Sequence, residues 1–468
     1  MFYNKPMPLP LPTLTEACAQ IVRGELSPLA LTRACLERIE QHNPDLNACI
    51  TITADLALEQ ARQAGVLPGQ TSKPLPTLAG IPLSLKDMYE TKGIRTTAGS
   101  KFFADYVPAE DASVVRKVKD AGAVILAKTN LHEIALGVTN INPHFGVCRN
   151  PWDTTRISGG SSGGSAVAVA SGMCLGALGT DTGGSIRIPA SLCGVVGLKP
   201  THGRVSLRGV IPLSWNLDHA GPLARTARDA ALLLQVIAGH DPGDPVSCDL
   251  PVYDYLAGIE DGVRDWRVTL AVGEYIEESD PEVLAAVRAA ARVFERLGAR
   301  LEEVEMSWLR EAALANGLMT QADAAAYHRA RLAEHPDWFG ADVRQRLQRG
   351  AAYTSTEYVL ARRTQAETRR RFEQFFAEGD ILLLPATPIS APPIEGADAI
   401  EQARRLTRFT AAFNLAGLPA MSLPCGFTAE GLPIGLQIVS RPWAEAAVLR
   451  AGCAYEQATE WHLRWPDL

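Results

Sequence analysis

Two loops rich in glycine and serine lie in the middle of the chain, at residues 159–165 (GGSSGGS) and 179–189 (GTDTGGSIRIP). A single run of this kind is more often a flexible linker. Here, however, apolar segments flank both loops, and the second loop repeats the pattern of the first. Serine hydroxyls beside glycines whose backbone N–H groups can approach a ligand are suited to nucleophilic acyl transfer. The two loops therefore predict a catalytic site.

Other interpretations of these loops fit less well. The first loop contains G-x-S-x-G twice, centred on Ser161 or Ser162. An α/β-hydrolase elbow needs an apolar strand directly before it, and residues 150–156 (NPWDTTR) make a poor strand. Neither loop has the lysine followed by serine or threonine of a phosphate-binding loop. The chain has no H-E-x-x-H motif or close His/Cys cluster, so we expect neither a metal nor a cofactor.

The order and spacing of several segments resemble the amidase signature family. The two loops are followed by residues 193–201 (CGVVGLKPT) and preceded by residues 80–87 (GIPLSLKD) and 127–130 (AKTN). Residues 217–222 (LDHAGP) and 414–420 (NLAGLPA) are similar to landmarks further along the family's chain. The resemblance thus covers nearly the whole sequence.

Carried over residue by residue, the resemblance implies a Ser-cisSer-Lys triad. Ser185 would be the nucleophile, Ser161 a proton relay held by a cis peptide, and Lys86 the base. A lysine accepts a proton only when its environment lowers its pKa. Burial at a strand end, beside glycine loops rich in N–H groups, would lower the pKa of Lys86 in this way.

The resemblance also assigns supporting roles around the nucleophile. The expected donors of the oxyanion hole are Thr182, Gly183, Gly184 and Ser185. One such donor contributes about 3 kcal/mol in a studied protease, so the loop matters as much as the base. Asp181 and Arg187 flank the nucleophile as an expected structural pair, and Ser162 is a further expected support of the loop.

The substrate pocket is harder to place, because family pockets combine the segment after Lys128 with a helical insert near residues 311–363. Apolar and aromatic side chains in these and neighbouring regions are the candidates for lining it: Leu136, Trp215, Tyr327 and Phe409. Each of them is more readily explained by core packing than by contact with a substrate. The expected reaction is hydrolysis of a neutral carboxamide or anilide through an acyl-enzyme, with esters or carbamates cleaved by the same steps.

Three alternatives to a stand-alone amidase remain. One is the glutamine-hydrolysing subunit of a tRNA-dependent amidotransferase. That subunit carries an aspartate before its Asn-Leu-Ala-Gly segment that receives the α-amino group of glutamine, whereas this chain has Thr407 there. The second is a carbamate (urethane) or ureide hydrolase of the same family. The third is a non-catalytic scaffold, which retention of Lys86, Ser161 and Ser185 argues against.

Alternating strand and helix patterns indicate the elements that must position these residues. Residues 81–86 and 123–127 are apolar runs typical of buried strands, with a helix expected between them at 113–121. This alternation predicts an α/β fold. The resemblance extends it to a single α/β/α domain with a mixed, mostly parallel central sheet covered by helices on both faces. Further strands are expected at 266–272, 301–306, 381–384, 418–427 and 433–439, and further helices at 229–238 and 281–297.

We expect one amidase signature domain over residues 1–468. It would comprise an N-terminal helical segment (13–65), a signature core (78–240), and a helical insert with the C-terminal part (266–468). Within the first segment, Ser27 followed by Pro28 is typical of a helix start.

Composition limits the partners. The chain has 468 residues, 47% of them hydrophobic, and a net charge of −7, so it offers no basic field for nucleic acid or an anionic membrane. Prolines interrupt residues 1–13, which argues against a membrane-spanning start. Nine cysteines without disulfide-like spacing favour a reducing compartment, the cytoplasm. We expect a small-molecule amide or carbamate substrate, and a monomer or homodimer.

Overall fold

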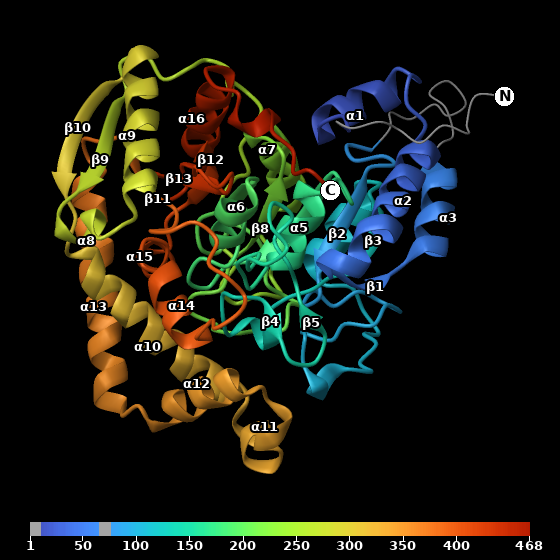
Figure 1. Cartoon of the computed structure of the whole chain (residues 1–468), viewed down its shortest axis with the longest axis horizontal. Coiled ribbons are helices and arrows are strands. Elements are labelled where there is room, and N and C mark those ends of the chain that lie inside the picture. The colour runs from blue at the N-terminus through green and yellow to red at the C-terminus, as the bar shows by residue number, and fades with distance from the viewer. Residues whose placement is uncertain (1–10, 65–75) are drawn as a thin grey trace.

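A large sheet runs through the computed structural model, which describes residues 11–64 and 76–468. Helices from all parts of the chain pack around this sheet (Figure 1). Its eleven strands are, in sheet order, β1 (Cys49–Ile52), β3 (Val124–Thr129), β2 (Pro82–Lys86), β6 (Gly176–Thr180), β8 (Ala220–Ala224), β7 (Val196–Lys199), β12 (Ala420–Phe427), β13 (Pro433–Val439), β11 (Ile381–Pro385), β9 (Arg267–Val272) and β10 (Arg300–Glu305). A two-stranded ribbon joins β4 (Ile141–Asn142) to β5 (Gly146–Val147).

The sheet is mixed, as predicted, but its parallel pairings are less extensive than expected. They join β3, β2 and β6 in one group and β11, β9 and β10 in another. Between these groups β8, β7, β12 and β13 pair antiparallel, and β1 pairs antiparallel at one edge. The reason is local for β12 and β13, because the five residues between them form a hairpin that forces an antiparallel pair.

Most of the predicted helices and strands are present, with ends displaced by a few residues at most. The strand expected at 433–439 coincides with β13, and the helix expected at 281–297 is α9. Ser27 caps α2 by accepting a hydrogen bond from the Ala30 N–H, with Pro28 in the first helical position. The helices are α1 (Leu14–Val22), α2 (Pro28–Leu46), α3 (Ala54–Ala64), α4 (Ser113–Asp120), α5 (Gly163–Ala170), α6 (Arg187–Cys193), α7 (Ala227–Ile237), α8 (Glu274–Glu277), α9 (Pro281–Arg296), α10 (Leu309–Tyr327), α11 (Arg329–Glu334), α12 (Ala341–Ala352), α13 (Ser355–Phe375), α14 (Ala399–Leu406), α15 (Ala411–Ala416) and α16 (Glu445–Gln457).

The predicted helical insert is an arm of helices at one end of the molecule. Helices α10 to α13 lie together at the lower left of Figure 1, below the sheet. Asn316 of α10 reaches back to the second glycine-serine loop, where its amide donates to the Thr182 C=O over 3.2 Å. The arm therefore contacts the segment that carries Ser185.

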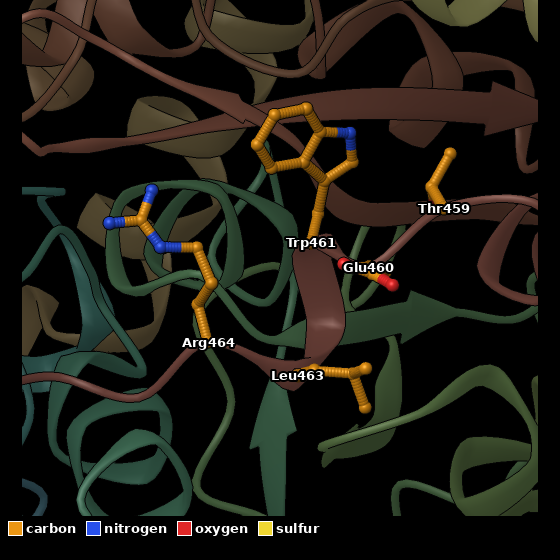
Figure 2. A pocket seen from close by; sticks show the side chains of 5 residues that line it. All are labelled: Thr459, Glu460, Trp461, Leu463 and Arg464. Carbon is orange, nitrogen blue, oxygen red and sulfur yellow. The ribbon is translucent and has the colours of Figure 1, made fainter.

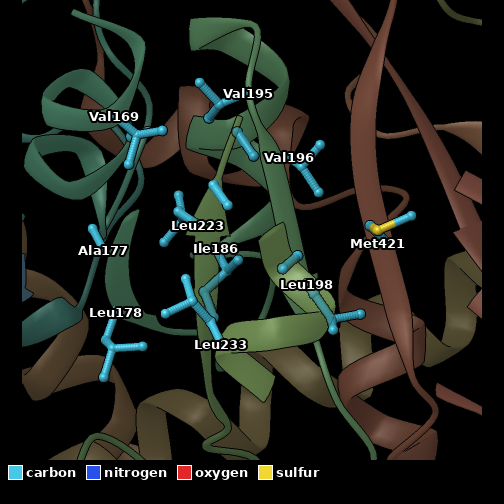
Figure 3. Close-up of a cluster of buried hydrophobic side chains, with 14 of the residues drawn as sticks. Val169, Ala177, Leu178, Ile186, Val195, Val196, Leu198, Leu223, Leu233 and Met421 are labelled. Atoms are coloured by element: carbon cyan, nitrogen blue, oxygen red, sulfur yellow. The ribbon is translucent and has the colours of Figure 1, made fainter. Parts of the chain in front are cut away.

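The hydrophobic core anchors the segments that follow the two serine loops. Figure 3 shows buried side chains from adjacent strands meeting there, among them Leu178 of β6, Leu223 of β8 and Leu198 of β7. Val169 of α5 and Ile186, which follows Ser185, join the same cluster. Each such fully buried side chain contributes about 1.5–3 kcal/mol to folding. The helix after the first loop and the residue after the nucleophile are thus anchored in one core.

Residues 1–10 and 65–75 lie outside the description, and with them most of the proline-interrupted start and the last residue of the predicted segment 13–65. Among the residues described, no helix has both the length and the apolar character needed to cross a membrane. Within residues 11–64 and 76–468, no group of three or more His, Cys, Asp or Glu side chains could hold a metal ion.

Candidate active site

Lys86 is the last residue of β2, and its side chain is fully buried. Its ammonium nitrogen Nζ lies 2.7 Å from Ser161 Oγ and 2.7 Å from Thr180 Oγ1. Burial lowers the pKa of Lys86 to about 7, although the charges of Asp218 and Asp181 act in the opposite direction. A neutral Lys86 is therefore accessible near pH 7. A neutral amine this close to a serine hydroxyl can accept its proton.

Ser161 lies in the first loop, directly before α5, and is fully buried. The Gly160–Ser161 peptide is cis, as the family resemblance implied. Gly164, in the first turn of α5, packs so tightly that an added Cβ would lie 2.5 Å from the backbone nitrogen of Asn130 and 2.4 Å from the C=O oxygen of Ala48. Glycine at this position lets the loop approach the end of β3, and so reach Lys86 on the neighbouring strand.

Ser162 ties the two glycine-serine loops together. Its N–H donates to the Ser185 C=O over 3.1 Å, and its hydroxyl donates to the Thr180 C=O over 3.1 Å. The Thr180 N–H donates in turn to the Ser162 hydroxyl over 3.2 Å. These three hydrogen bonds are the contacts through which Ser162 would support the loop, as expected from the sequence.

Ser185 lies between β6 and α6, on a loop organised by Asp181. One carboxylate oxygen of Asp181 accepts from the Gly184 N–H over 2.7 Å, and the other accepts from the Ile186 N–H over 3.1 Å. Ser185, only 5% exposed, is held between these two anchored peptides. The nucleophile candidate is therefore fixed by contacts of its two neighbours.

Asp181 and Arg187 form a fully buried ion pair, with 2.9 Å between Arg187 Nη2 and Asp181 Oδ1. The same guanidinium donates to Gln437 Oε1 over 2.6 Å and to Asn414 Oδ1 over 2.6 Å. Burial alone would raise the pKa of Asp181, but the charge and hydrogen bonds of Arg187 outweigh it and lower that pKa below its usual range. The expected structural pair is thus the centre of a network that joins α6, α15 and β13.

One predicted oxyanion donor is already engaged. The Gly184 N–H points to Asp181, so it cannot also donate to a substrate oxyanion. The Gly183 C=O accepts from the Thr410 hydroxyl over 2.6 Å, which fixes the peptide between Gly183 and Gly184. We therefore correct the expected set: Thr182, Gly183 and Ser185 remain as N–H donors, and Gly184 shapes the turn at φ +137°.

Sequence reasoning missed several polar residues that hold this loop. Thr180 contacts Lys86, and Asp218 accepts from the Thr182 hydroxyl over 2.5 Å. Asn414 donates to the Asp181 C=O over 2.9 Å. Asp218 and Asn414 do belong to segments that matched family landmarks, but nothing in the local sequence pattern assigns them a partner so far away in the chain.

The four predicted pocket residues have different surroundings. Phe409 belongs to a buried hydrophobic cluster and packs edge-on against Tyr275, with ring centroids 5.6 Å apart. Leu136 is buried as well, and its C=O accepts from Arg346 over 2.7 Å. Trp215 is half exposed and packs against Tyr327 at 5.9 Å between ring centroids. Phe409 and Leu136 are thus core residues, and Trp215 with Tyr327 forms an aromatic pair at the surface.

The side chains beside the nucleophile loop are different ones. A Cβ added at Gly183 would lie 3.1 Å from Asn316 Oδ1 and 4.0 Å from Thr407 Cγ2. Thr407 is therefore next to the loop, where the comparison with amidotransferase subunits had placed a residue that selects the substrate. The signal for Thr407 was its position before the segment at 414–420.

Two histidines before the first glycine-serine loop, His132 and His144, have polar partners that could not be identified from the sequence. The His132 ring contacts Asp342 at 3.0 Å and Thr139 at 3.3 Å, and the His144 ring contacts Glu133 at 3.0 Å. Neither histidine ring contacts a serine in these pairs. They brace the segment before the first glycine-serine loop and do not form a Ser-His-Asp triad.

A separate surface pocket lies in the C-terminal segment after α16 (Figure 2). Its lining residues are Thr459, Glu460, Trp461, Leu463 and Arg464. The Arg464 guanidinium lies 3.8 Å above the ring of Phe427 at the end of β12. None of the lining residues belongs to the glycine-serine loops or to β2, so this pocket is distinct from the site around Ser185.

Comparison with known proteins agrees with this geometry. The model of the amidase family matches residues 30–449, which include both glycine-serine loops and Lys86. The chain belongs to the amidase signature family. Members of this family are C–N hydrolases.

Relatives in the amidase signature family have different names and contexts. A glutamyl-tRNA(Gln) amidotransferase subunit from Geobacter sp. (strain M21) is 40% identical, with 97% of this chain and 98% of the relative covered. A solved chain from a vestigial protein complex linked to the origins of an s-triazine catabolic enzyme is 33% identical, with a TM-score of 0.90. The match covers 95% of this chain and 98% of the solved chain. A bacterial aryl acylamidase is 27% identical, with a TM-score of 0.88. The match covers 96% of this chain and 97% of the acylamidase. The similarity thus extends over nearly the whole of each chain, although the relatives carry different names.

Proposed function

We propose that this chain is a serine hydrolase that cleaves the C–N bond of a small, neutral carboxamide or anilide through an acyl-enzyme. The observation that carries the proposal is the buried Lys86 Nζ at 2.7 Å from Ser161 Oγ, on a loop bonded to Ser185. Serine is a weak nucleophile until a neighbouring base removes its proton. Lys86, with a pKa of about 7, is matched to that task at neutral pH.

In the proposed reaction Lys86 draws a proton from Ser161, which draws one from Ser185. Ser185 Oγ then attacks the carbonyl carbon, and the N–H groups of Thr182, Gly183 and Ser185 stabilise the oxyanion. The proton returns through Ser161 to the leaving nitrogen, and the C–N bond breaks. Water activated by the same relay hydrolyses the ester at Ser185. No step needs a metal ion or a cofactor.

The side chains beside the nucleophile loop support a neutral substrate. Asn316 and Thr407, which flank Gly183, are both uncharged. A free amino acid would leave its α-ammonium group without a carboxylate partner there, which is costly once water is excluded. The aryl acylamidase among the structural relatives is a precedent for a stand-alone hydrolase. Carbamates and ureides present a similar neutral carbonyl and are proposed as further substrates.

A second candidate is favoured by the curated relatives. Glutamyl-tRNA(Gln) amidotransferase subunits from Geobacter sp. (strain M21) and from Moorella thermoacetica are 40% and 41% identical over 97% of this chain. Under this candidate the same serine site would release ammonia from glutamine, and the chain would work with partner proteins. Thr407 is the residue that separates the two candidates, because it adjoins Gly183 and carries no charge.

The test is hydrolysis of a panel containing an aliphatic amide, an aryl anilide, glutamine, biuret and an aryl carbamate, with amine and ammonia both measured. The proposal predicts turnover of a neutral amide, anilide or carbamate that disappears in Ser185→Ala and survives a chelator. Hydrolysis of glutamine alone would support the amidotransferase candidate. Turnover that persists in Ser185→Ala would refute both.

A matched variant sharpens the choice between the two candidates. Thr407→Asp places a carboxylate beside Gly183, where it can pair with an α-ammonium group. The proposal predicts that this variant gains glutamine hydrolysis and loses rate on neutral amides. Unchanged rates on both neutral amides and glutamine would contradict the assignment of Thr407 to the substrate side of the loop.

A further inference from the structure

Asp218 lies between the nucleophile loop and the helical arm, just before β8. Its oxygen Oδ1 accepts from the Thr182 hydroxyl over 2.5 Å. Oδ2 accepts from the backbone N–H groups of Leu213 and Ser214 over 2.9 and 3.1 Å. A carboxylate with three hydrogen-bond donors, only 6% exposed, is held in one orientation. Burial raises the pKa of Asp218 to about 6, so its carboxylate is mainly charged at pH 7. One of its three hydrogen bonds, from the Thr182 hydroxyl, reaches the loop that carries Ser185.

Thr182 is fixed at both ends by this arrangement. Asp218 holds its hydroxyl, and Asn316 of α10 donates to its C=O over 3.2 Å. Thr182 begins the turn that supplies the N–H donors of the proposed oxyanion hole. Because such donors work only if they are fixed before the charge develops, the two contacts matter for rate as well as for folding.

Asp218 also acts on Lys86 electrostatically. Two carboxylates favour the charged form of Lys86 and raise its pKa, and the effect of Asp218 is larger than that of Asp181. Asp181 is neutralised by its direct pair with Arg187, whereas the hydrogen-bond donors of Asp218 are the neutral groups named above. Ser161 and Thr180, the hydrogen-bond partners of Lys86 Nζ, are uncharged. Asp218 binds Thr182, which is two residues from the Thr180 hydroxyl that contacts Lys86 Nζ. Its carboxylate is therefore the main charge that opposes the effect of burial on Lys86.

We propose that Asp218 is a positioning residue of the hydrolase, which holds Thr182 in the nucleophile loop and supplies the negative charge that keeps buried Lys86 a strong enough base. This inference rests on the proposed function, since it gives Asp218 a role only if Ser185 and Lys86 act as proposed. Without that charge Lys86 stays neutral to lower pH, and accepts a proton less readily.

Ser214, whose N–H binds Asp218, also binds a second buried carboxylate, which offers a matched control. Asp323 of α10 accepts from the Ser214 hydroxyl over 2.5 Å and from the Tyr358 hydroxyl over 2.8 Å. Like Asp218 it is 6% exposed and bound by hydroxyl groups. It is not among the charges that act on Lys86. Asp323→Asn therefore removes a buried carboxylate from the same network that is not among the groups shifting the pKa of Lys86.

The experiment measures the rate at which a fluorophosphonate labels Ser185, between about pH 5 and pH 9, so that no natural substrate is needed. Ser185→Ala is the blank, and circular dichroism verifies the fold of each variant. In the wild type the rate should fall as the pH drops through about 7, where Lys86 becomes protonated. In Asp218→Asn this acid limb should move down by about one pH unit. In Asp323→Asn it should stay in place.

A second variant tests the positioning role by itself. Thr182→Val keeps the carboxylate of Asp218 but removes the hydroxyl that binds it. The labelling rate at pH 8 should fall by about tenfold or more, with the acid limb within about 0.3 pH unit of wild type. Because this variant keeps the charge, it remains informative if Asp218→Asn does not fold.

The outcomes separate this inference from the proposed function. If wild-type Ser185 is not labelled, the proposed function fails. If it is labelled but the acid limb of folded Asp218→Asn coincides with that of wild type, the charge role of Asp218 is overturned while the hydrolase stands. A Thr182→Val variant that reacts at the wild-type rate overturns the positioning role. An acid limb that shifts equally in Asp323→Asn also overturns the inference, because the effect would then be structural.

Discussion

Replacing Asp181 by asparagine should destabilise the protein through an uncompensated buried charge. The side chains of Asp181 and Arg187 are fully buried and pair at 2.9 Å. Asparagine keeps the shape of the side chain but removes the negative charge, leaving the guanidinium with the neutral acceptors Gln437 Oε1, Asn414 Oδ1 and the Thr410 C=O. Removing one partner of such a pair costs about 3–5 kcal/mol. The three neutral acceptors remain, so we expect a value near the lower end of this range, about 3 kcal/mol.

The assay is urea unfolding followed by tryptophan fluorescence, together with activity. A loss of about 3 kcal/mol is a large part of the stability of an ordinary protein, which is about 5–15 kcal/mol. Activity should fall as well, by about tenfold or more, because Asp181 also holds the Gly184 and Ile186 N–H groups on either side of Ser185.

The double variant Asp181→Asn/Arg187→Met is the control. It removes the unpaired cation, so it should recover part of the lost stability without recovering activity. A single variant within about 1 kcal/mol of wild type would refute the reasoning, since neutral acceptors would then suffice for Arg187. A double variant less stable than the single one would refute it too.

Three further outcomes follow from the geometry. Lys86→Met should reduce kcat/KM by about a thousandfold or more, because the base is lost. The fold should be retained, because an apolar chain replaces a buried amine. A smaller loss of kcat/KM would remove Lys86 from the mechanism. Gly184→Ala should lower both the melting temperature and kcat, since a Cβ there would meet Thr410 Oγ1 at 2.3 Å and the backbone φ is +137°; wild-type melting would contradict this packing. Burial raises the pKa of Glu456 to about 8, so its contribution to stability is present at low pH and is lost as pH rises through that value. Melting temperatures of wild type should therefore fall more steeply than those of Glu456→Gln from about pH 5 to pH 8, and parallel curves over that range would count against this effect.

The elements that could be predicted were those whose apolar pattern is strong. The run at 433–439 is buried throughout and coincides with β13, and the run ending at Lys86 is β2. Strands β6 (GALGT) and β8 (AGPLA) were not predicted, because glycine and proline have low strand propensity. They form because both are fully buried in the middle of the sheet, where tertiary packing outweighs local preference.

The site divides in the same way. Glycine-serine spacing and the family resemblance singled out Ser161, Ser185 and Lys86, and the structure places the ammonium group of Lys86 against Ser161. The residues that hold them, such as Asp218 and Asn316, contact the loop from far along the chain. The engagement of the Gly184 N–H was also missed, since it depends on how the loop folds back on itself. Such contacts have no local periodicity from which to predict them.

The most direct test of the central claim is peptide mass mapping of the protein quenched during turnover of the best substrate in the panel. The account predicts an acyl group, equal in mass to the substrate's acyl part, on the peptide that contains Ser185, and no such adduct in Ser185→Ala. An adduct on another residue, or hydrolysis by Ser185→Ala at the wild-type rate, would contradict nucleophilic catalysis by Ser185.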